Sequence, residues 1–487
     1  MINDQSKTPL YDALRTHALS EVLPFDVPGH KKGSAIPPRF IQDVGREIFK
    51  MDANSTKALD LLSNPEGPIH EAQILAAKLF GADHAYFLVN GSTAGVQNMI
   101  LASVSEGEKI ILPRNVHKSA INALILSGAI PVYVEPTIHP QTGIAMGVAL
   151  EAYASAIKEH PEAKAVFALH PTYHGFTSDL SAICALAHAH DMVVLADQAH
   201  GSLFSFHEAL PPSAMACGAD MATLSLHKSG SSLSQSSLML LKEGRIRPGR
   251  VRTAINLMQT SSASYLLMAS LDLARHFLAH EAHQKLTQLF PRIEAFKATV
   301  MQQSALTFMD QSMTDAHSPY HDPTKLCVDF SAYDISGFEV YDQLAEKYEI
   351  QCELGESRVV LALASLADDV FSLNHLAKTL IQFTKTLKPR KIIHQAWTME
   401  SYPSMVYTPR EAFQRDSEKV LLSEAEGRIA ADALMVYPPG IPIVVAGEII
   451  TESVIEQFTR WHDKDNFLVG ATTVDEALYV RVIKEKE

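Results

Sequence analysis

Short runs of apolar residues alternate with longer segments of helical periodicity between residues 65 and 245. The apolar runs predict strands at His84–Val89, Lys109–Leu112, Pro131–Val134, Ala165–Leu169, Met192–Ala196, Ala222–Leu226 and Ser237–Leu241. The segments between them predict helices at Glu71–Phe80, Ala94–Val104, Ser119–Ser127, Leu150–Glu159 and Leu180–His190. Strands covered on both faces are apolar throughout, as Met192–Ala196 is, so the pattern predicts an α/β domain with a mainly parallel sheet.

The pattern changes after residue 260 and indicates further domains. Residues 260–300 are helical throughout, whereas 325–383 mix strand-like runs with helices, which is typical of a smaller α+β unit. A chain of 487 residues is too long for one compact core. We therefore predict an N-terminal segment (1–45), a large ligand-binding domain (46–300), a small α+β domain (301–390) and a C-terminal α+β domain (391–487).

Composition narrows the class of partner. The chain has 41 basic and 55 acidic residues and a formal charge of −14, which argues against nucleic acid and anionic membranes and is compatible with a cationic small molecule. It has no apolar run of about 18 residues, no secretory layout at its start, and only scattered cysteines. We expect a cytoplasmic protein without a metal site.

Three polar motifs follow predicted strands: Gly91-Ser92-Thr93, Asp197-Gln198-Ala199-His200 and Ser225-Leu226-His227-Lys228. Ligands of parallel sheets bind at the carboxyl ends of strands, so these motifs are expected to share a site. The first offers hydroxyl and N–H groups for a phosphate, the second a carboxylate for a pyridinium nitrogen, and the third an amine for a Schiff base. Together they predict a pyridoxal phosphate site.

Each residue taken alone also has a structural interpretation. Ser92 and Thr93 suit a helix cap, Asp197 suits a metal ligand or a cap, and Lys228 could be a surface lysine. His117 could stack on a flat ring or simply begin a helix, and His200 could touch the cofactor or pack. No HExxH, GxGxxG or GxxxxGK[ST] motif stands at a strand–helix junction, so metal hydrolase, dinucleotide and P-loop functions lack support.

Longer motifs along nearly the whole chain carry a resemblance to a known family. They lie at residues 8–11, 27–33, 65–69, 90–93, 113–119, 171–173, 408–413 and 427–448. On these motifs the chain resembles the fold-type I, pyridoxal-phosphate-dependent ornithine/lysine/arginine decarboxylases, specifically their short bacterial form, and within it the arginine decarboxylases. The resemblance implies an aspartate aminotransferase-like fold with a small α+β domain and a C-terminal α+β domain. It also implies a homodimer or higher homo-oligomer.

The resemblance assigns roles to individual residues. It implies that Lys228 forms the Schiff base and that Asp197 pairs with the pyridine nitrogen. The groups expected around the rest of the cofactor are Ser92, Thr93, Ser225 and His227 at the phosphate, His117 stacked on the ring and His200 beside it. His227 or Lys228 would protonate the α-carbon. Glu353 is the candidate partner of the substrate's distal cation, with Glu448 a weaker candidate and a surface glutamate the alternative.

The implied reaction is α-decarboxylation of a basic amino acid, first of all L-arginine to agmatine and CO2 for polyamine biosynthesis. Three departures from the family pattern, at residues 61–64, at 354–357 and at Ala446, leave lysine and ornithine open as substrates. A fourth places Gln198 where the family has glutamate. Remoter alternatives are another fold-type I reaction, such as transamination, or a non-catalytic regulator descended from a decarboxylase.

Overall fold

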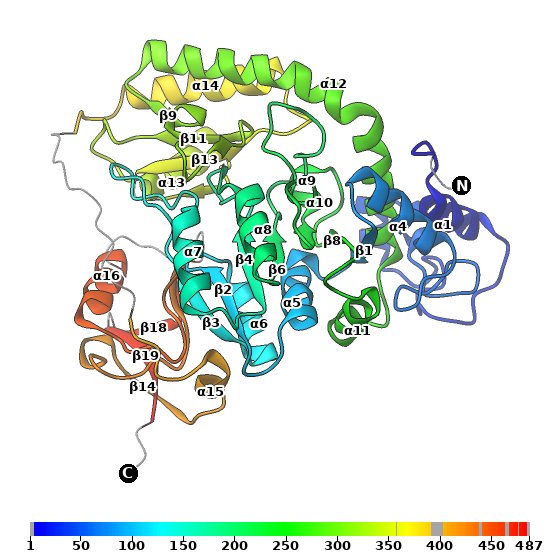
Figure 1. Ribbon diagram of the computed structural model, residues 1–487. Coiled ribbons are helices and arrows are strands. Elements are labelled where there is room, and N and C mark those ends of the chain that lie inside the picture. The colour runs from blue at the N-terminus through cyan, green and yellow to red at the C-terminus, as the bar shows by residue number, and fades with distance from the viewer. Residues whose placement is uncertain are drawn as a thin grey trace. The chain divides into compact units, whose positions relative to one another are not determined.

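The computed structural model describes residues 4–356, 358–390, 403–437, 441–462, 467–475 and 477–484 (Figure 1). The chain divides into two compact units, each made of two stretches of sequence. Unit 1 comprises Met1–Ala102 with Val193–Leu286, and unit 2 comprises Ser103–Met192 with Thr287–Glu487. Within the described ranges no helix is both long enough and apolar enough to span a bilayer.

Unit 1 contains four buried strands, and the predicted motifs lie at the carboxyl ends of three of them. Their order is β1 (His84–Leu88), β8 (Ser237–Leu241), β7 (Met221–Leu224) and β6 (Val193–Asp197). β6 and β7 are parallel, whereas β8 runs antiparallel to both β7 and β1. The helices of this part are α5 (Gly91–Ser103), α9 (Ala214–Cys217), α10 (Leu226–Ser229) and α11 (Pro248–Met258).

Gly95 lets α5 approach β7 closely. A Cβ added at Gly95 would lie 2.0 Å from Thr223 Oγ1, so a larger residue at this position would force the helix away from the strand. The close packing fixes the start of α5 near the end of β7. It thereby positions the motif that begins at Gly91 and the motif that begins at Ser225.

The N-terminal segment of unit 1 is held by a buried ion pair. It forms α1 (Pro9–Leu19), α2 (Pro38–Val44), α3 (Glu47–Met51) and α4 (Pro68–Leu79). Asp272 and Arg275 lie on the long helix α12 (Tyr265–Gln303), 2.8 Å apart and fully buried. Asp272 accepts hydrogen bonds from the first amides of α1, and Arg275 donates to backbone carbonyls of residues 5 and 7. The pair thus satisfies helix-end groups that would otherwise be unpaired.

Unit 2 contains a second group of parallel strands and a small antiparallel sheet. The parallel strands are β4 (Ala165–Leu169), β2 (Lys109–Pro113) and β3 (Ile130–Val134), in that order. Their helices are α6 (Lys118–Ser127), α7 (Leu150–Glu159) and α8 (Leu180–Ala189). The short strands β5 (Phe176–Thr177) and β10 (Tyr320–His321) pair with one another.

The small antiparallel sheet of unit 2 has the order β12 (Leu354–Gly355), β13 (Val359–Leu363), β11 (Lys325–Asp329) and β9 (Thr307–Met309). It comes with the helices α13 (Gly337–Tyr348) and α14 (Val370–Thr384). The side chains of β11 are all buried, and Cys327, Leu354 and Leu361 share a core with residues of β5 and β9. This sheet corresponds to the α+β unit that the sequence predicts.

The C-terminal part of unit 2, orange to red in Figure 1, forms two three-stranded sheets around its own core. One sheet has the order β14 (Ser417–Leu421), β19 (Ala477–Ile483) and β18 (Ala471–Val474). The other has the order β16 (Ile441–Val444), β15 (Leu434–Tyr437) and β17 (Phe467–Val469). Its helices are α15 (Pro409–Phe413) and α16 (Glu452–His462), and its core includes Leu434, Val444, Phe458 and Val480.

One predicted boundary matters for the site and is wrong. The apolar run Ala222–Leu226 was expected to be a single strand, but β7 ends at Leu224 and Leu226 already begins α10. Ser225 is the residue between them, and a short helical turn follows. Lys228 therefore lies in this turn and not directly at the end of a strand.

Candidate active site

The hydroxyls expected at a phosphate meet at the start of α5. Gly91 has φ +69°, a left-handed conformation that favours glycine, and its amide donates to the carbonyl of Gln235 at 2.8 Å. Ser225 is fully buried, and its Oγ donates to Ser92 Oγ at 2.7 Å. The first turn of a helix also presents unpaired N–H groups and the positive end of the helix dipole. The arrangement is therefore suited to a phosphate group. Thr93, which was also expected at the phosphate, has an exposed position.

Lys228 and His200 come together although 28 residues separate them. Lys228 Nζ lies 2.6 Å from His200 Nε2, which places the predicted amine beside the last residue of the second motif. His227 Nδ1 lies 2.9 Å from the carbonyl of Ser236. A carbonyl only accepts hydrogen bonds, so Nδ1 carries the proton and Nε2 of His227 is the atom that can exchange one.

Asp197 is the last residue of β6 and is 8% exposed. One of its oxygens accepts a hydrogen bond from the amide of Ala199 at 3.1 Å. Burial raises the pKa of the Asp197 carboxyl, while this amide and the charge of Lys228 act in the opposite direction. Among the described residues Asp197 forms no ion pair, so a cationic ring nitrogen would supply the partner that a buried carboxylate needs.

Gln198 shows how the structure accommodates one departure from the family pattern. Its side chain is buried, with Nε2 donating to the carbonyl of Gly201 at 2.7 Å and Oε1 accepting from the amide of Ala214 at 2.7 Å. An amide can do both, whereas an ionised carboxylate only accepts. Gln198 therefore braces the loop that carries His200.

The remaining predicted residues lie in unit 2. His117 is the N-cap of α6, where its Nδ1 accepts from the amide of Ser119 at 3.2 Å. Its helix-start role is thus observed, and its stacking on a cofactor ring stays a prediction. Glu353 is exposed, and its charge raises the pKa of the buried Lys325 amine, against the stronger effect of burial. Its role toward a substrate also stays a prediction.

Glu448 has a structural role, so its interpretation as a weaker substrate partner is wrong. Both of its oxygens accept hydrogen bonds from Arg114, at 2.5 and 2.7 Å, and one also accepts from the amide of Val445 at 2.9 Å. Both side chains are essentially fully buried. A carboxylate engaged bidentately by one guanidinium is not available to another.

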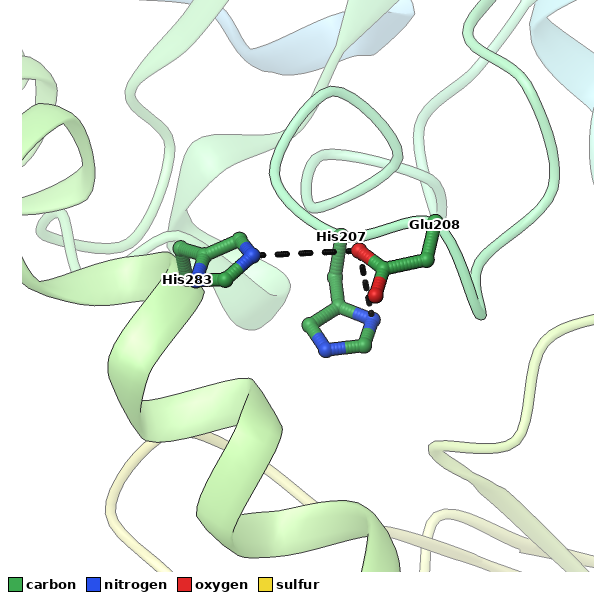
Figure 2. A group of neighbouring side chains, drawn as sticks. All are labelled: His207, Glu208 and His283. Carbon is green, nitrogen blue, oxygen red and sulfur yellow. Dashed lines mark ion pairs between the residues drawn. The ribbon is translucent and has the colours of Figure 1, made fainter.

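A group of His207, Glu208 and His283 lies on the surface of unit 1 (Figure 2). Glu208 Oε2 is 3.7 Å from His207 Nδ1 and 3.7 Å from His283 Nε2. The Nδ1 lone pair of His207 already accepts a hydrogen bond from the amide of Ala209 at 3.1 Å, and the other two side chains are 81% and 70% exposed. Hydrogen bonding and ion pairing account for this group, and we assign no metal to it.

Comparison with known proteins identifies the family. The profile described as Orn/Lys/Arg decarboxylase, major domain, matches residues 8–366, and that of the C-terminal domain of the same family matches residues 392–470. The chain belongs to the Orn/Lys/Arg decarboxylase family. The predicted resemblance and the predicted enzyme class, an amino acid decarboxylase, are thereby confirmed.

This decarboxylase is similar to curated proteins over its full length. It is 38% identical to the arginine decarboxylase of Bacillus subtilis, with 99% of each chain covered. It is also 38% identical to the arginine decarboxylase of Halalkalibacterium halodurans, again with 99% of each chain covered.

Solved structures confirm the predicted fold. The decarboxylase resembles the constitutive lysine decarboxylase of E. coli with a TM-score of 0.86 at 21% identity, over 98% of this chain and 82% of that one. A more distant neighbour is the serine palmitoyltransferase of Sphingomonas wittichii, with a TM-score of 0.55 at 14% identity, covering 79% and 86% of the two chains. The fold-type I architecture with a mainly parallel central sheet is therefore correct.

The family implies pyridoxal phosphate, and the residues of unit 1 fit this group. Ser92, Ser225 and the start of α5 would hold the phosphate, and Asp197 would pair with the ring nitrogen. Lys228 would supply the covalent link. The fit rests on the hydroxyl pair at 2.7 Å and on the buried carboxylate that lacks an ion-pair partner within the described chain.

Two residues of unit 2 that the sequence analysis does not name as candidates, Glu356 and His174, lie 3.5 Å apart. A usable signal existed for Glu356, since residues 354–357 depart from the family pattern. No such signal marked His174. The proximity of His174 to Glu356 is apparent only in the structure, where the loop after β4 lies beside the end of β12.

Proposed function

We propose that this enzyme converts L-arginine to agmatine and CO2 with pyridoxal phosphate as its cofactor. The observation that carries the proposal is the similarity to four curated arginine decarboxylases at 38–39% identity, with at least 91% of this chain covered. Lysine is the second candidate, because proteins named lysine decarboxylases share the fold at 20–21% identity. Fold similarity at that level says little about the substrate.

The residues of unit 1 can be given roles in this reaction. Bound pyridoxal phosphate supplies an electron sink for the bond to the departing carboxylate. Asp197 would keep the ring nitrogen protonated, and His200 would orient the amine of Lys228 through the 2.6 Å contact. As CO2 leaves, the α-carbon takes up one proton, which His227 Nε2 or Lys228 Nζ would donate. His227 suits this task because its other nitrogen is fixed on a carbonyl.

The test is a product assay on purified, cofactor-loaded protein given arginine, lysine and ornithine separately. We expect CO2 and agmatine from arginine, with kcat/KM for lysine and ornithine lower by roughly two orders of magnitude, because their ammonium group lacks the planar fork of a guanidinium. Cadaverine or putrescine as the main product would show that the substrate is lysine or ornithine and would support the same decarboxylation reaction. A keto acid without CO2 would contradict the proposal.

We further propose a homodimer or higher homo-oligomer located in the cytoplasm and serving polyamine biosynthesis. Exposed apolar side chains on the N-terminal segment support self-association, namely Leu19, Val22, Leu23, Phe25 and Val27. A run of exposed apolar residues is typical of a protein interface. The four cysteines are free and buried, as is usual in a reducing compartment.

Phe25, which is 95% exposed, provides a test of self-association. Phe25→Asp should weaken the dimer by at least ~10-fold, since an aromatic anchor at an interface commonly contributes 2 kcal/mol or more. Sedimentation velocity over a concentration series measures the effect. Phe371→Asp is the control, because Phe371 is 79% exposed in unit 2 and should leave the mass unchanged. An unchanged dimer for Phe25→Asp would exclude this segment from the interface.

A further inference from the structure

Glu356 is a mostly buried carboxyl group, and no lysine or arginine of the described ranges forms an ion pair with it. It follows β12, its amide donates to the carbonyl of Val359 at 2.9 Å, and its side chain is 17% exposed. Burial raises the pKa of Glu356 to about 8. Among the described residues its ion-pair neighbour is His174, whose Nε2 lies 3.5 Å from Oε2. Burial lowers the pKa of His174 to about 3, so this imidazole is neutral near pH 7.

His174, beside Glu356, has a ring nitrogen that can accept a hydrogen bond. It lies in the loop after β4, and its carbonyl accepts a hydrogen bond from His321 Nε2 at 3.0 Å, which helps to fix the loop. Two buried atoms of this loop, His174 Nε2 and Thr172 Oγ1, have no hydrogen-bond partner in the described structure. Buried polar atoms are almost always paired in folded proteins, so unpaired ones indicate a place for a ligand or an ordered water.

Glu353, the glutamate that sequence reasoning favoured, has a different environment. It lies three residues before Glu356 but is exposed, and its charge acts on the buried Lys325. Lys325 is thus a cation of the chain that interacts with Glu353, although its stronger acidic neighbour is Asp322. Within the described part of the chain the ion-pair neighbour of Glu356 is a neutral imidazole, and a carboxylate in that position gains more from a cationic ligand than one that is exposed to water.

We propose that Glu356 and His174 form a recognition site in unit 2 for a guanidinium group, a role that rests on the proposed function. A guanidinium is a planar cation with five N–H donors and no acceptor. When the carboxyl group of Glu356 is ionised, it can accept two parallel hydrogen bonds from the guanidinium, and His174 Nε2 can accept another, which satisfies both groups and pairs the buried negative charge. The guanidinium can belong to substrate arginine or to agmatine.

The test compares the wild-type holoenzyme with Glu356→Gln and with the control Glu346→Gln, which changes an exposed glutamate of α13 in the same unit. Glutamine keeps the size of the side chain and resembles the protonated acid, so folding should be preserved. We expect Glu356→Gln to raise KM for arginine roughly 10-fold or more, as for the loss of a charged hydrogen bond, and Glu346→Gln to change it less than ~2-fold. His174→Asn provides a second variant with the same expected direction, should Glu356→Gln be unstable.

Calorimetric titration with agmatine gives a readout that does not need turnover. A rise in KM together with weaker agmatine binding assigns the site to the guanidinium of the substrate. Weaker agmatine binding with unchanged KM assigns it to the free amine, and both results support a guanidinium site. Unchanged KM and unchanged agmatine affinity in both Glu356→Gln and His174→Asn would overturn it. Failure of the wild type to release CO2 from arginine would instead refute the proposed function, while the titration still tests the site.

Discussion

Replacing Lys228 with alanine should lower CO2 release from arginine at least ~10³-fold, because the amine that would carry the cofactor and exchange protons is lost. Lys228 Nζ is 2.6 Å from His200 Nε2, in the same unit as Asp197 and the Ser92–Ser225 hydroxyl pair. Borohydride reduction followed by mass spectrometry should find the cofactor mass on the Lys228 peptide of the wild type and on no peptide of the variant. Product assays measure the loss of activity on the same samples.

Two controls separate loss of the amine from damage to the fold. Lys242→Ala removes a half-buried lysine just after β8 in the same unit and should leave both readouts unchanged. In Lys228→Ala the hydroxyl pair and Asp197 remain, so the variant should still bind cofactor without a covalent link. Retention of the cofactor mass on a peptide of this variant, or of more than about a tenth of the activity, would contradict the assignment of Lys228.

The bounds of strands could be predicted from the sequence where burial alone determines them. The strands Ala165–Leu169 and Ser237–Leu241 have the predicted bounds, because short apolar runs between polar segments are constrained by the core on both faces. The apolar pattern does not show in which direction a strand runs. β8 is as apolar as the parallel strands, yet it runs antiparallel to both neighbours. Nothing in its composition could have shown this.

The motifs of the candidate site could be predicted from the sequence, whereas the local backbone and the burial of individual residues could be predicted less well. Lys228 and His200 meet as expected, but the predicted strand before Lys228 extends two residues too far, to Leu226. Leu224, Ser225 and Leu226 alone do not show where the backbone bends. Which of two glutamates three residues apart is buried depends on β12, a strand too short for periodicity to reveal. The order Glu353 exposed and Glu356 enclosed thus emerges only from the fold.

Long-range charge pairing was the least predictable feature, and Glu448 is the clearest case. Its partner Arg114 lies 334 residues away, and no local pattern connects the two. Arg114 follows β2 of the predicted large domain, and it also donates to the carbonyl of Ile443 at 3.0 Å and stacks over Tyr133, with 4.8 Å between its guanidinium carbon and the ring centre. The ion pair therefore fastens the C-terminal part of unit 2 to the strands that precede it in the chain.

Glu448→Ala should lower the free energy of unfolding of unit 2 by about 3–5 kcal/mol, because it leaves the fully buried Arg114 charge without its partner. Denaturant unfolding monitored by circular dichroism measures the change. The control is Glu418→Ala, which breaks a 2.7 Å pair with Arg428 whose side chains are 22% and 42% exposed, and it should cost less than about 1 kcal/mol.

The double variant Arg114→Met with Glu448→Met distinguishes a buried charge penalty from loss of packing. Removing both charges and filling the space should recover part of the stability that Glu448→Ala loses, since an apolar pair in a buried position carries no desolvation penalty. If Glu448→Ala were no more destabilising than Glu418→Ala, the pair would not be buried in solution. Glu448 would then be free to meet a cationic substrate, which is the role that its position in the sequence first suggested.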